Sequence, residues 1–355
     1  MKHLGDFRAR TGPASPRSQT GNTRDSGTKD SRTPLKRIGL GAIAIAIMIT
    51  APAWAAGPVE VKLEAKFPEG RAIRYRVRTS KNQLVKNLGM EMPSNQDRTV
   101  VYAIEAGPRR GDSTRPVSVK LESLRERQRL PGGRDVLHDS KDPSADRVAH
   151  PDLEFFKPMY RVEDGLAFTA ILDARGRVKA IEGGEVVRSK LSTLDPVAVD
   201  LLKSRLSDDS LAREFERAIG LSALPESPVK PGASWEKTES VDAGAGIELV
   251  LKKKYEYTGT EKKGNREIDR IKIQVLEVHC RQDADSSSPM KLAKEEIKVI
   301  SSEGFVLFDR SEGRALEVRD RVQLEGRLTL AHEGRDQQVG FDLTIRTESQ
   351  PAGGS

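Results

Sequence analysis

The stretch LEVRDRVQLEGRLTL, residues 316–330, decides the fold of this 355-residue chain. Its apolar side chains recur at every second position, and only Asp320 and Gly326 break the phase. Successive side chains of a β-strand point to opposite faces, so the pattern predicts a strand with one buried and one wet face. At about 3.3 Å per residue this strand is on the order of 50 Å long. Strands usually contain about five or six residues, so it is far longer than most. The stretch therefore predicts a long, curved antiparallel sheet with a bend near Gly326.

The same alternation predicts further half-buried strands along most of the chain. They are expected at residues 59–66, 73–78, 99–106, 117–130, 247–257, 268–279 and 339–347. Helices interrupt this pattern only near 184–220. There Asp195-Pro196 forms an N-cap and first-turn proline, and Leu211, Phe215 and Ile219 follow at a spacing of four before Gly220. A central helical hairpin packed on a sheet face is the expected arrangement.

An internal repeat divides the mature chain. The segment 168–173, followed by a turn and Gly176-Arg177-Val178, is echoed by 305–309, a turn and Gly313-Arg314-Ala315. We therefore expect an α+β fold that is mostly β, with long curved antiparallel sheets built from a duplicated unit. The predicted halves are 56–225 and 226–348, and 349–355 is expected to be a disordered tail.

The N-terminal segment has the order of a signal peptide. A long polar n-region ends in Lys36-Arg37, an uncharged run covers 38–50, and small residues at Ala53, Ala55 and Ala56 fit a signal-peptidase site after Ala55. The apolar run is shorter than the 18 or more residues of a stable membrane anchor, so cleavage is favoured over an uncleaved inner-membrane anchor. The sequence thus predicts export to the periplasm or the medium, with membrane contact only through the signal segment.

Charge and cysteine content narrow the function classes. Residues 1–55 hold nine basic and three acidic residues, so the formal charge of +7 leaves +1 for residues 56–355. So balanced a domain has no global attraction for phosphate backbones, and no nucleic-acid partner is expected. The single cysteine, Cys280, excludes an intramolecular disulfide.

Reactive motifs are sparse, and we predict no catalytic, cofactor-binding or metal-binding residues and no cofactor. One alternative stays open. His138 lies beside Asp139 and Asp142, where a base and two carboxylates could serve a secreted hydrolase. The same composition also suits a solvated loop, because Asp, Ser and Pro favour turns.

Several short motifs occur in a recognisable order. They are Phe67-Pro68-Glu69-Gly70 with Tyr75, Leu130-Pro131-Gly132-Gly133, Asp139-Ser140-x-Asp142-Pro143, Pro231-Gly232-x-Ser234-Trp235-Glu236 and Ser302-Glu303-Gly304-x-x-x-Phe308-Asp309. Together they resemble an exported bacterial family catalogued only as a domain of unknown function, over nearly all of 59–349. The resemblance implies a shared β-rich fold and assigns no activity.

These observations favour an exported, non-enzymatic envelope or periplasmic protein. It would act as a binding scaffold or carrier for an apolar ligand or a polypeptide, since a curved sheet closed by helices can enclose an apolar groove. The hydrolase and a structural interaction module of the cell envelope, with an envelope protein as partner, are the alternatives.

Overall fold

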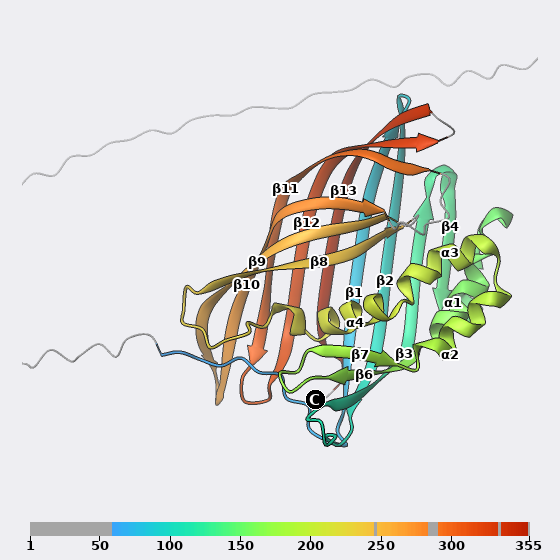
Figure 1. Ribbon diagram of the computed structural model, residues 1–355. Coiled ribbons are helices and arrows are strands. Elements are labelled where there is room, and N and C mark those ends of the chain that lie inside the picture. Colours follow the sequence, from blue (N-terminus) through green and yellow to red (C-terminus); the bar gives the residue numbers. More distant parts are fainter. Residues whose placement is uncertain (1–58, 245–246, 283–289, 333–334, 354–355) are drawn as a thin grey trace, which may run out of the picture. The chain divides into compact units, whose positions relative to one another are not determined.

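The structure, a computed structural model, describes residues 59–244, 247–282, 290–332 and 335–353. The predicted signal peptide, with its cleavage site at Ala53, Ala55 and Ala56, lies outside these residues. The described part confirms a mostly β architecture with four α-helices, arranged around one large sheet (Figure 1).

Thirteen antiparallel strands form that sheet. Its order is β5-β4-β3-β2-β1-β13-β12-β11-β10-β9-β8. Off this path, β6 pairs with β3 on one side and with β7 on the other. The strands are β1 (Ala72–Asn87), β2 (Met90–Ala106), β3 (Arg115–Leu130), β4 (Arg134–Asp139), β5 (Arg147–Val148), β6 (Ala167–Leu172), β7 (Val178–Glu182), β8 (Ser234–Gly244), β9 (Ile247–Lys263), β10 (Arg266–Gln282), β11 (Lys291–Asp309), β12 (Arg314–His332) and β13 (Arg335–Pro351). The long strand expected from residues 316–330 is β12.

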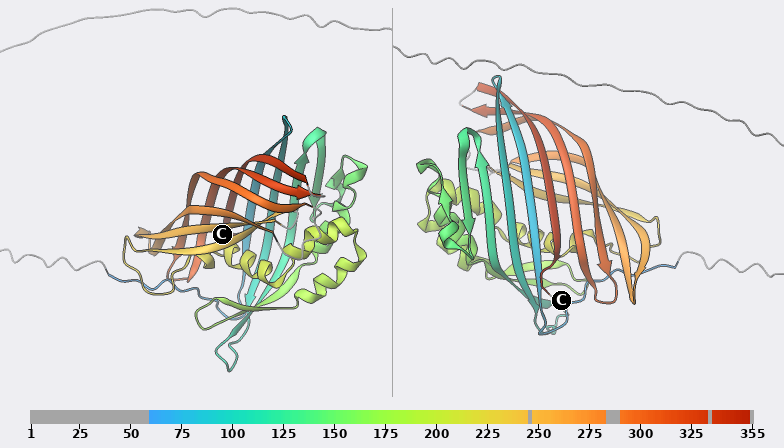
Figure 2. Two further views of the ribbon diagram at one scale, coloured as in Figure 1. Left: turned by 45° about the horizontal axis from the view of Figure 1, so that its top comes forward. Right: turned by 180° about the vertical axis from the view of Figure 1, so that it is seen from behind.

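The helices lie on one face of the sheet, which we call the inner face (Figure 2). They are α1 (Phe156–Asp164), α2 (Gly184–Arg188), α3 (Pro196–Arg205) and α4 (Asp208–Ala218). The α3–α4 pair confirms the predicted helical hairpin. Ser207 caps α4, where its hydroxyl accepts a hydrogen bond from the Ser210 N–H, and Leu211 and Phe215 are buried. In the described part of the chain, no helix combines the length and apolarity that crossing a bilayer requires.

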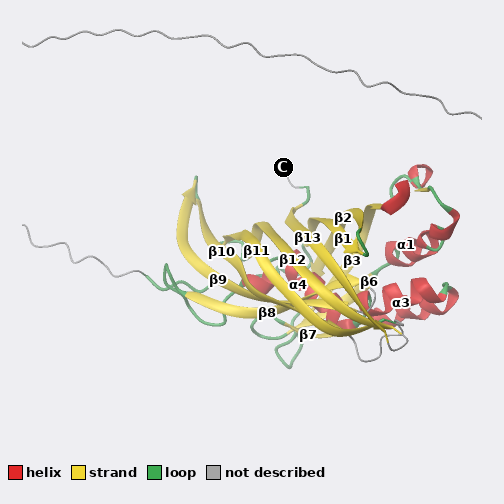
Figure 3. Ribbon diagram, turned by 90° about the horizontal axis from the view of Figure 1, so that it is seen from above, coloured by secondary structure: helices red, strands yellow, loops and turns green. Residues whose placement is uncertain are grey.

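Strong curvature brings distant strands together on the inner face. β1 and β8 are six strand steps apart in the sheet, which is about 30 Å if the sheet were flat. Nevertheless, the Lys81 ammonium on β1 donates a hydrogen bond to the Asp242 carbonyl on β8 at 2.9 Å. The sheet therefore closes toward itself, as Figure 3 shows from above.

The duplicated unit appears as two similar meanders. Strand order β1-β2-β3-β6-β7 in the first is matched by β8-β9-β10-β11-β12 in the second. Tyr75 faces Tyr102 across the first strand pair, and Trp235 faces Tyr255 across the equivalent pair. The insertion of β4, β5 and α1 distinguishes the first copy, and strands of both predicted halves share one sheet.

Two expectations for the chain ends were wrong. Residues 59–66 alternate as predicted, and Leu63 is buried, but the segment forms no strand: its backbone makes an isolated bridge from Val61 to Val229 and a hydrogen bond from the Lys66 N–H to the Gly313 carbonyl. Residues 349–351, expected in a disordered tail, complete β13. Ser349 is buried and its hydroxyl donates to the Ala218 carbonyl, so a contact with α4 fixes this end of the strand.

Candidate functional site

A row of polar side chains crosses the otherwise apolar inner face. Directly paired positions on β3, β2, β1, β13 and β12 read Glu126, Arg98, Thr79, Thr347 and Asp320. The neighbouring row on one side is mainly apolar, with Leu124, Val100, Val77, Ser349 and Val318 in the same strands. Side chains on one face of a strand are two residues apart, so the apolar side chains of each strand form a line along it. The polar row crosses the five strands and interrupts each of these lines at the same height in the sheet.

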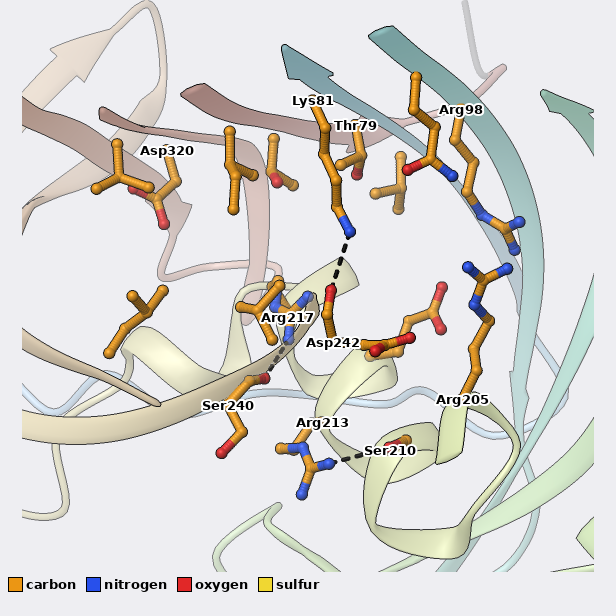
Figure 4. A pocket seen from close by; sticks show the side chains of 18 of the residues that line it. Thr79, Lys81, Arg98, Arg205, Ser210, Arg213, Arg217, Ser240, Asp242 and Asp320 are labelled. Atoms are coloured by element: carbon orange, nitrogen blue, oxygen red, sulfur yellow. Dashed lines mark hydrogen bonds between the residues drawn. The ribbon is translucent and has the colours of Figure 1, made fainter. Parts of the chain in front are cut away.

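A cavity of about 140 Å³ lies at this level, between the helices α3 and α4 and the inner face of the curved sheet, including its last strand, β8 (Figure 4). Apolar side chains from the strands line part of it, including Val100, Leu251, Val322 and Ile345. Six basic side chains and three acidic ones line the rest: Lys81, Arg98, Arg205, Arg213, Arg217 and Lys253, with Glu214, Asp242 and Asp320. The cavity is thus apolar and charged at once, which is the lining expected for an amphipathic ligand.

Two of the basic residues are fully engaged by buried carboxylates. Arg98 donates to Glu126 at 2.6 Å and to Glu163 at 2.7 Å, and Arg205 donates to Glu163 at 2.6 Å. Burial alone would raise the pKa of Glu163, but the two guanidinium groups outweigh it and hold the pKa at about 2. This cluster ties β2 and β3 to α1 and α3.

Lys253 is compensated in the same way. Its ammonium contacts Asp320 at 2.6 Å and Glu239 at 3.0 Å, and the Tyr255 hydroxyl also donates to Glu239. Burial opposes ionisation of Glu239, yet Lys253 and Arg217 together lower its pKa to about 2. Asp320, the break in the long alternating stretch, is therefore the counter-ion of a buried lysine on β9.

Lys81 and Arg217 have a different kind of partner. Lys81 donates to the Asp242 carbonyl at 2.9 Å, and Arg217 donates to the Ser240 carbonyl at 3.2 Å. Both carbonyls belong to β8, the last strand of the sheet. The Nε atom of Arg217 is buried without a hydrogen-bond partner. Burial lowers the pKa of the Lys81 ammonium, although the nearby Asp242 opposes the shift.

A second cavity, of about 310 Å³, adjoins the first. It lies between α4, β8 and the segment 221–227, and Arg213 and Arg217 line both cavities. Burial lowers the pKa of Lys237 and raises that of Glu216, as expected for groups enclosed in such a space. Only the two arginine side chains of α4 are shared between the cavities, so they stand at the junction.

The residues of the hydrolase alternative do not converge. His138 is buried on β4, stacked on Tyr160, and its ring nitrogens contact Asp146 at 3.2 Å and Asp164 at 3.0 Å. Asp139 follows on the opposite face of the strand and pairs with Arg125 at 3.6 Å.

Asp142 is exposed and accepts a hydrogen bond from the Ser144 hydroxyl. None of His138, Asp139 and Asp142 lines a cavity described above. The contacts of His138 instead join β4 to α1 and to the loop that carries Asp146.

Among the described residues, no group of three or more His, Cys, Asp or Glu side chains is placed to hold a metal ion. Sequence reasoning missed the cavity, since its residues come from six strands and two helices. Asp320 was the one visible signal, as a charged residue on an otherwise apolar strand face.

Comparisons with known proteins agree with the predicted resemblance. Residues 112–268, which include all four α-helices, match the model of the "Family of unknown function (DUF6263)". The resemblance to a family of unknown function is therefore confirmed, although the match covers residues 112–268 and not nearly all of 59–349 as expected. No curated protein matches the chain.

Two solved structures align with most of this chain at low similarity. A structure titled "Lipid-protein interactions in lipovitellin" aligns with a TM-score of 0.40 and 10% identity over 81% of this chain and 26% of that one, so the chain spans about a quarter of that protein. DynF, from the dynemicin biosynthesis pathway of Micromonospora chersina, aligns with a TM-score of 0.18 and 7% identity over 83% of this chain and 86% of that one. Both TM-scores lie below 0.5, so neither structure is a guide to the ligand of this chain.

Proposed function

We propose that this chain is an exported, non-enzymatic binding protein or carrier that holds an amphipathic ligand against the inner face of its sheet. The observation that carries the proposal is the pair of adjoining cavities beneath α4. At about 140 and 310 Å³ they together reach about 450 Å³, within the range of roughly 300–1,000 Å³ that is usual for ligand pockets. Export rests on the signal-peptide pattern of residues 36–56.

The contacts around α4 support entry of a ligand. On its inner side, Arg217 reaches β8 through a backbone carbonyl, and Arg213 reaches Glu248 on β9 at 3.2 Å. These are partly exposed polar contacts, and such contacts contribute only about 1 kcal/mol each. Separation of α4 from β8 would join the two cavities at a small cost in stability.

A matched pair of variants on β1 tests the proposal. Thr79 lines the smaller cavity, while Ser80, the next residue, points to the opposite face of the sheet. The full chain would be expressed with its leader, extracted mildly and examined by native mass spectrometry for a co-purifying ligand. We expect a ligand in the wild type and in Ser80→Trp, and none in Thr79→Trp, with all three proteins folded by circular dichroism.

A wild type that carries no ligand and binds neither cis-parinaric acid nor its methyl ester would refute the proposal and favour a structural interaction module. Sequencing of the N-terminus of the exported protein tests cleavage after Ala55. A chain that still begins before Lys36 would favour the uncleaved anchor.

A further inference from the structure

Five of the six basic side chains of the smaller cavity fall into two groups, and the sixth, Arg213, pairs with Glu248. Arg98, Arg205 and Lys253 are held by buried carboxylates, so their charges are already compensated. Lys81 and Arg217 are hydrogen-bonded to carbonyl oxygens, which are neutral acceptors. A carbonyl stabilises a cation less than a carboxylate does, because it has only a partial negative charge, whereas the carboxylate adds the attraction of a full one.

The two side chains are close enough to share one group. Their acceptors, the carbonyls of Ser240 and Asp242, are two residues apart on one strand and thus about 7 Å apart. Figure 4 shows the end of the Lys81 side chain at Asp242 and the Arg217 guanidinium close to Ser240, in the same part of the cavity. The ammonium has three N–H donors and uses one on Asp242, and the Arg217 Nε–H has no partner.

We infer that the ligand carries an anionic group, a phosphate or a carboxylate, that binds between Lys81 and Arg217 at the junction of the two cavities. The inference rests on the proposed carrier function and names the chemistry of its ligand. Because Arg217 lines both cavities, a ligand that runs from one to the other passes this point. Val100, Leu251 and Ile345 then contact its apolar part.

The competing explanation is structural. Lys81 and Arg217 could serve only to cover the free carbonyls of the last strand, as charged residues often do at a sheet edge. In that case, their replacement would change stability without altering ligand preference. Binding of charged and uncharged forms of one probe distinguishes the two explanations.

The test compares the affinity of the full chain for cis-parinaric acid, for its uncharged methyl ester and for inorganic phosphate. We expect the acid to bind at least tenfold more tightly than the ester. Lys81→Gln and Arg217→Gln should each weaken acid binding about tenfold, the loss of one charged hydrogen bond, and leave ester binding unchanged. Arg217→Lys, which keeps the charge, should restore part of the preference.

Arg78→Gln is the matched control, since it removes one charge from the exposed face of the same strand, β1, and should change neither affinity. Displacement of the acid by millimolar phosphate would show that the site recognises the anionic group itself. Equal affinity of the wild type for acid and ester would overturn the inference and leave the carrier function standing. Phosphate binding without either lipid would uphold the anion site and overturn the apolar part of the carrier proposal.

Discussion

Glu163 gives the sharpest prediction about stability. Its carboxylate is buried on α1 between Arg98 and Arg205, at 2.7 and 2.6 Å. Glu163→Gln keeps the shape but removes the negative charge between two guanidinium groups. Removing one partner of a buried ion pair costs about 3–5 kcal/mol, because the remaining charge is left uncompensated. At roughly 2–4 °C per kcal/mol for a chain of this size, we expect the melting temperature to fall by about 6–20 °C.

The same residue makes the stability depend on pH in a defined window. Its pKa is about 2 in the folded protein, against an ordinary value of 4.5. A lowered carboxyl pKa stabilises the fold fully above the unfolded value, and this contribution is lost as the pH falls from about 4.5 to about 2. A shift of this size corresponds to about 3 kcal/mol. The wild type should lose that much more stability than Glu163→Gln over this window.

Urea unfolding followed by circular dichroism at pH 7, 4 and 2.5 measures both effects. Glu122→Gln is the matched control, because Glu122 pairs with Arg74 at 2.8 Å on the exposed part of the sheet. Such surface pairs contribute less than about 1 kcal/mol. If Glu163→Gln were as stable as Glu122→Gln at pH 7, or had the same pH slope as the wild type, the reasoning about the buried cluster would be refuted.

Three further predictions concern single positions. Leu88 has φ of +49° in the two-residue turn between β1 and β2. Because asparagine adopts this left-handed conformation more readily than leucine, Leu88→Asn should raise the free energy of unfolding by about 1 kcal/mol. Chemical denaturation would measure this, and an unchanged midpoint would contradict it. At Gly326 a Cβ atom would lie 2.8 Å from the Phe341 ring, so Gly326→Ala should destabilise the protein by about 1–3 kcal/mol, detectable as a lower urea midpoint. Burial, with Glu295 adding to it, raises the pKa of the Cys280 thiol to about 12, so Ellman's reagent at pH 8 should react only after denaturation, and rapid native labelling would show the thiol to be accessible.

Alternation in the sequence predicted where most strands lie but not how far they extend. β1 and β2 continue through residues 80–98, where polar side chains occupy both faces and no period is visible. Their pairing is set by neighbouring strands and by the turn at Leu88-Gly89, and neither is evident in a local window. Conversely, residues 59–66 alternate clearly but meet other backbone only at Val61 and at Lys66, which is too little pairing for a strand.

Helix α1 was not predicted, although its sequence has a helical period. Phe156, Met159, Tyr160 and Glu163 are all buried at helical spacing, so a period of 3.6 was present. Pro158 stands in the first turn, where a helix tolerates proline. The pattern was hidden because one of the buried residues, Glu163, is charged. Glu163 is buried because it pairs with Arg98 on β2 and Arg205 on α3, and neither contact is visible in the local sequence.

These observations separate two uses of charge on the inner face. Arg98, Arg205 and Lys253 are bound by carboxylates supplied by the fold, and their replacement should act on stability. Lys81 and Arg217 form their hydrogen bonds to strand carbonyls, which other donors or water could satisfy, and the carboxylates of Asp242 and Glu239 act on them only from nearby, so their replacement should act mainly on binding. A double variant, Lys81→Gln with Arg217→Gln, should therefore lose its preference for an anionic probe while it unfolds within about 3 kcal/mol of the wild type, roughly the difference between two hydrogen bonds with charged donors and the two neutral ones that glutamine can form. Loss of more than twice that stability would place both residues in the structural group and remove the physical basis for the anion site.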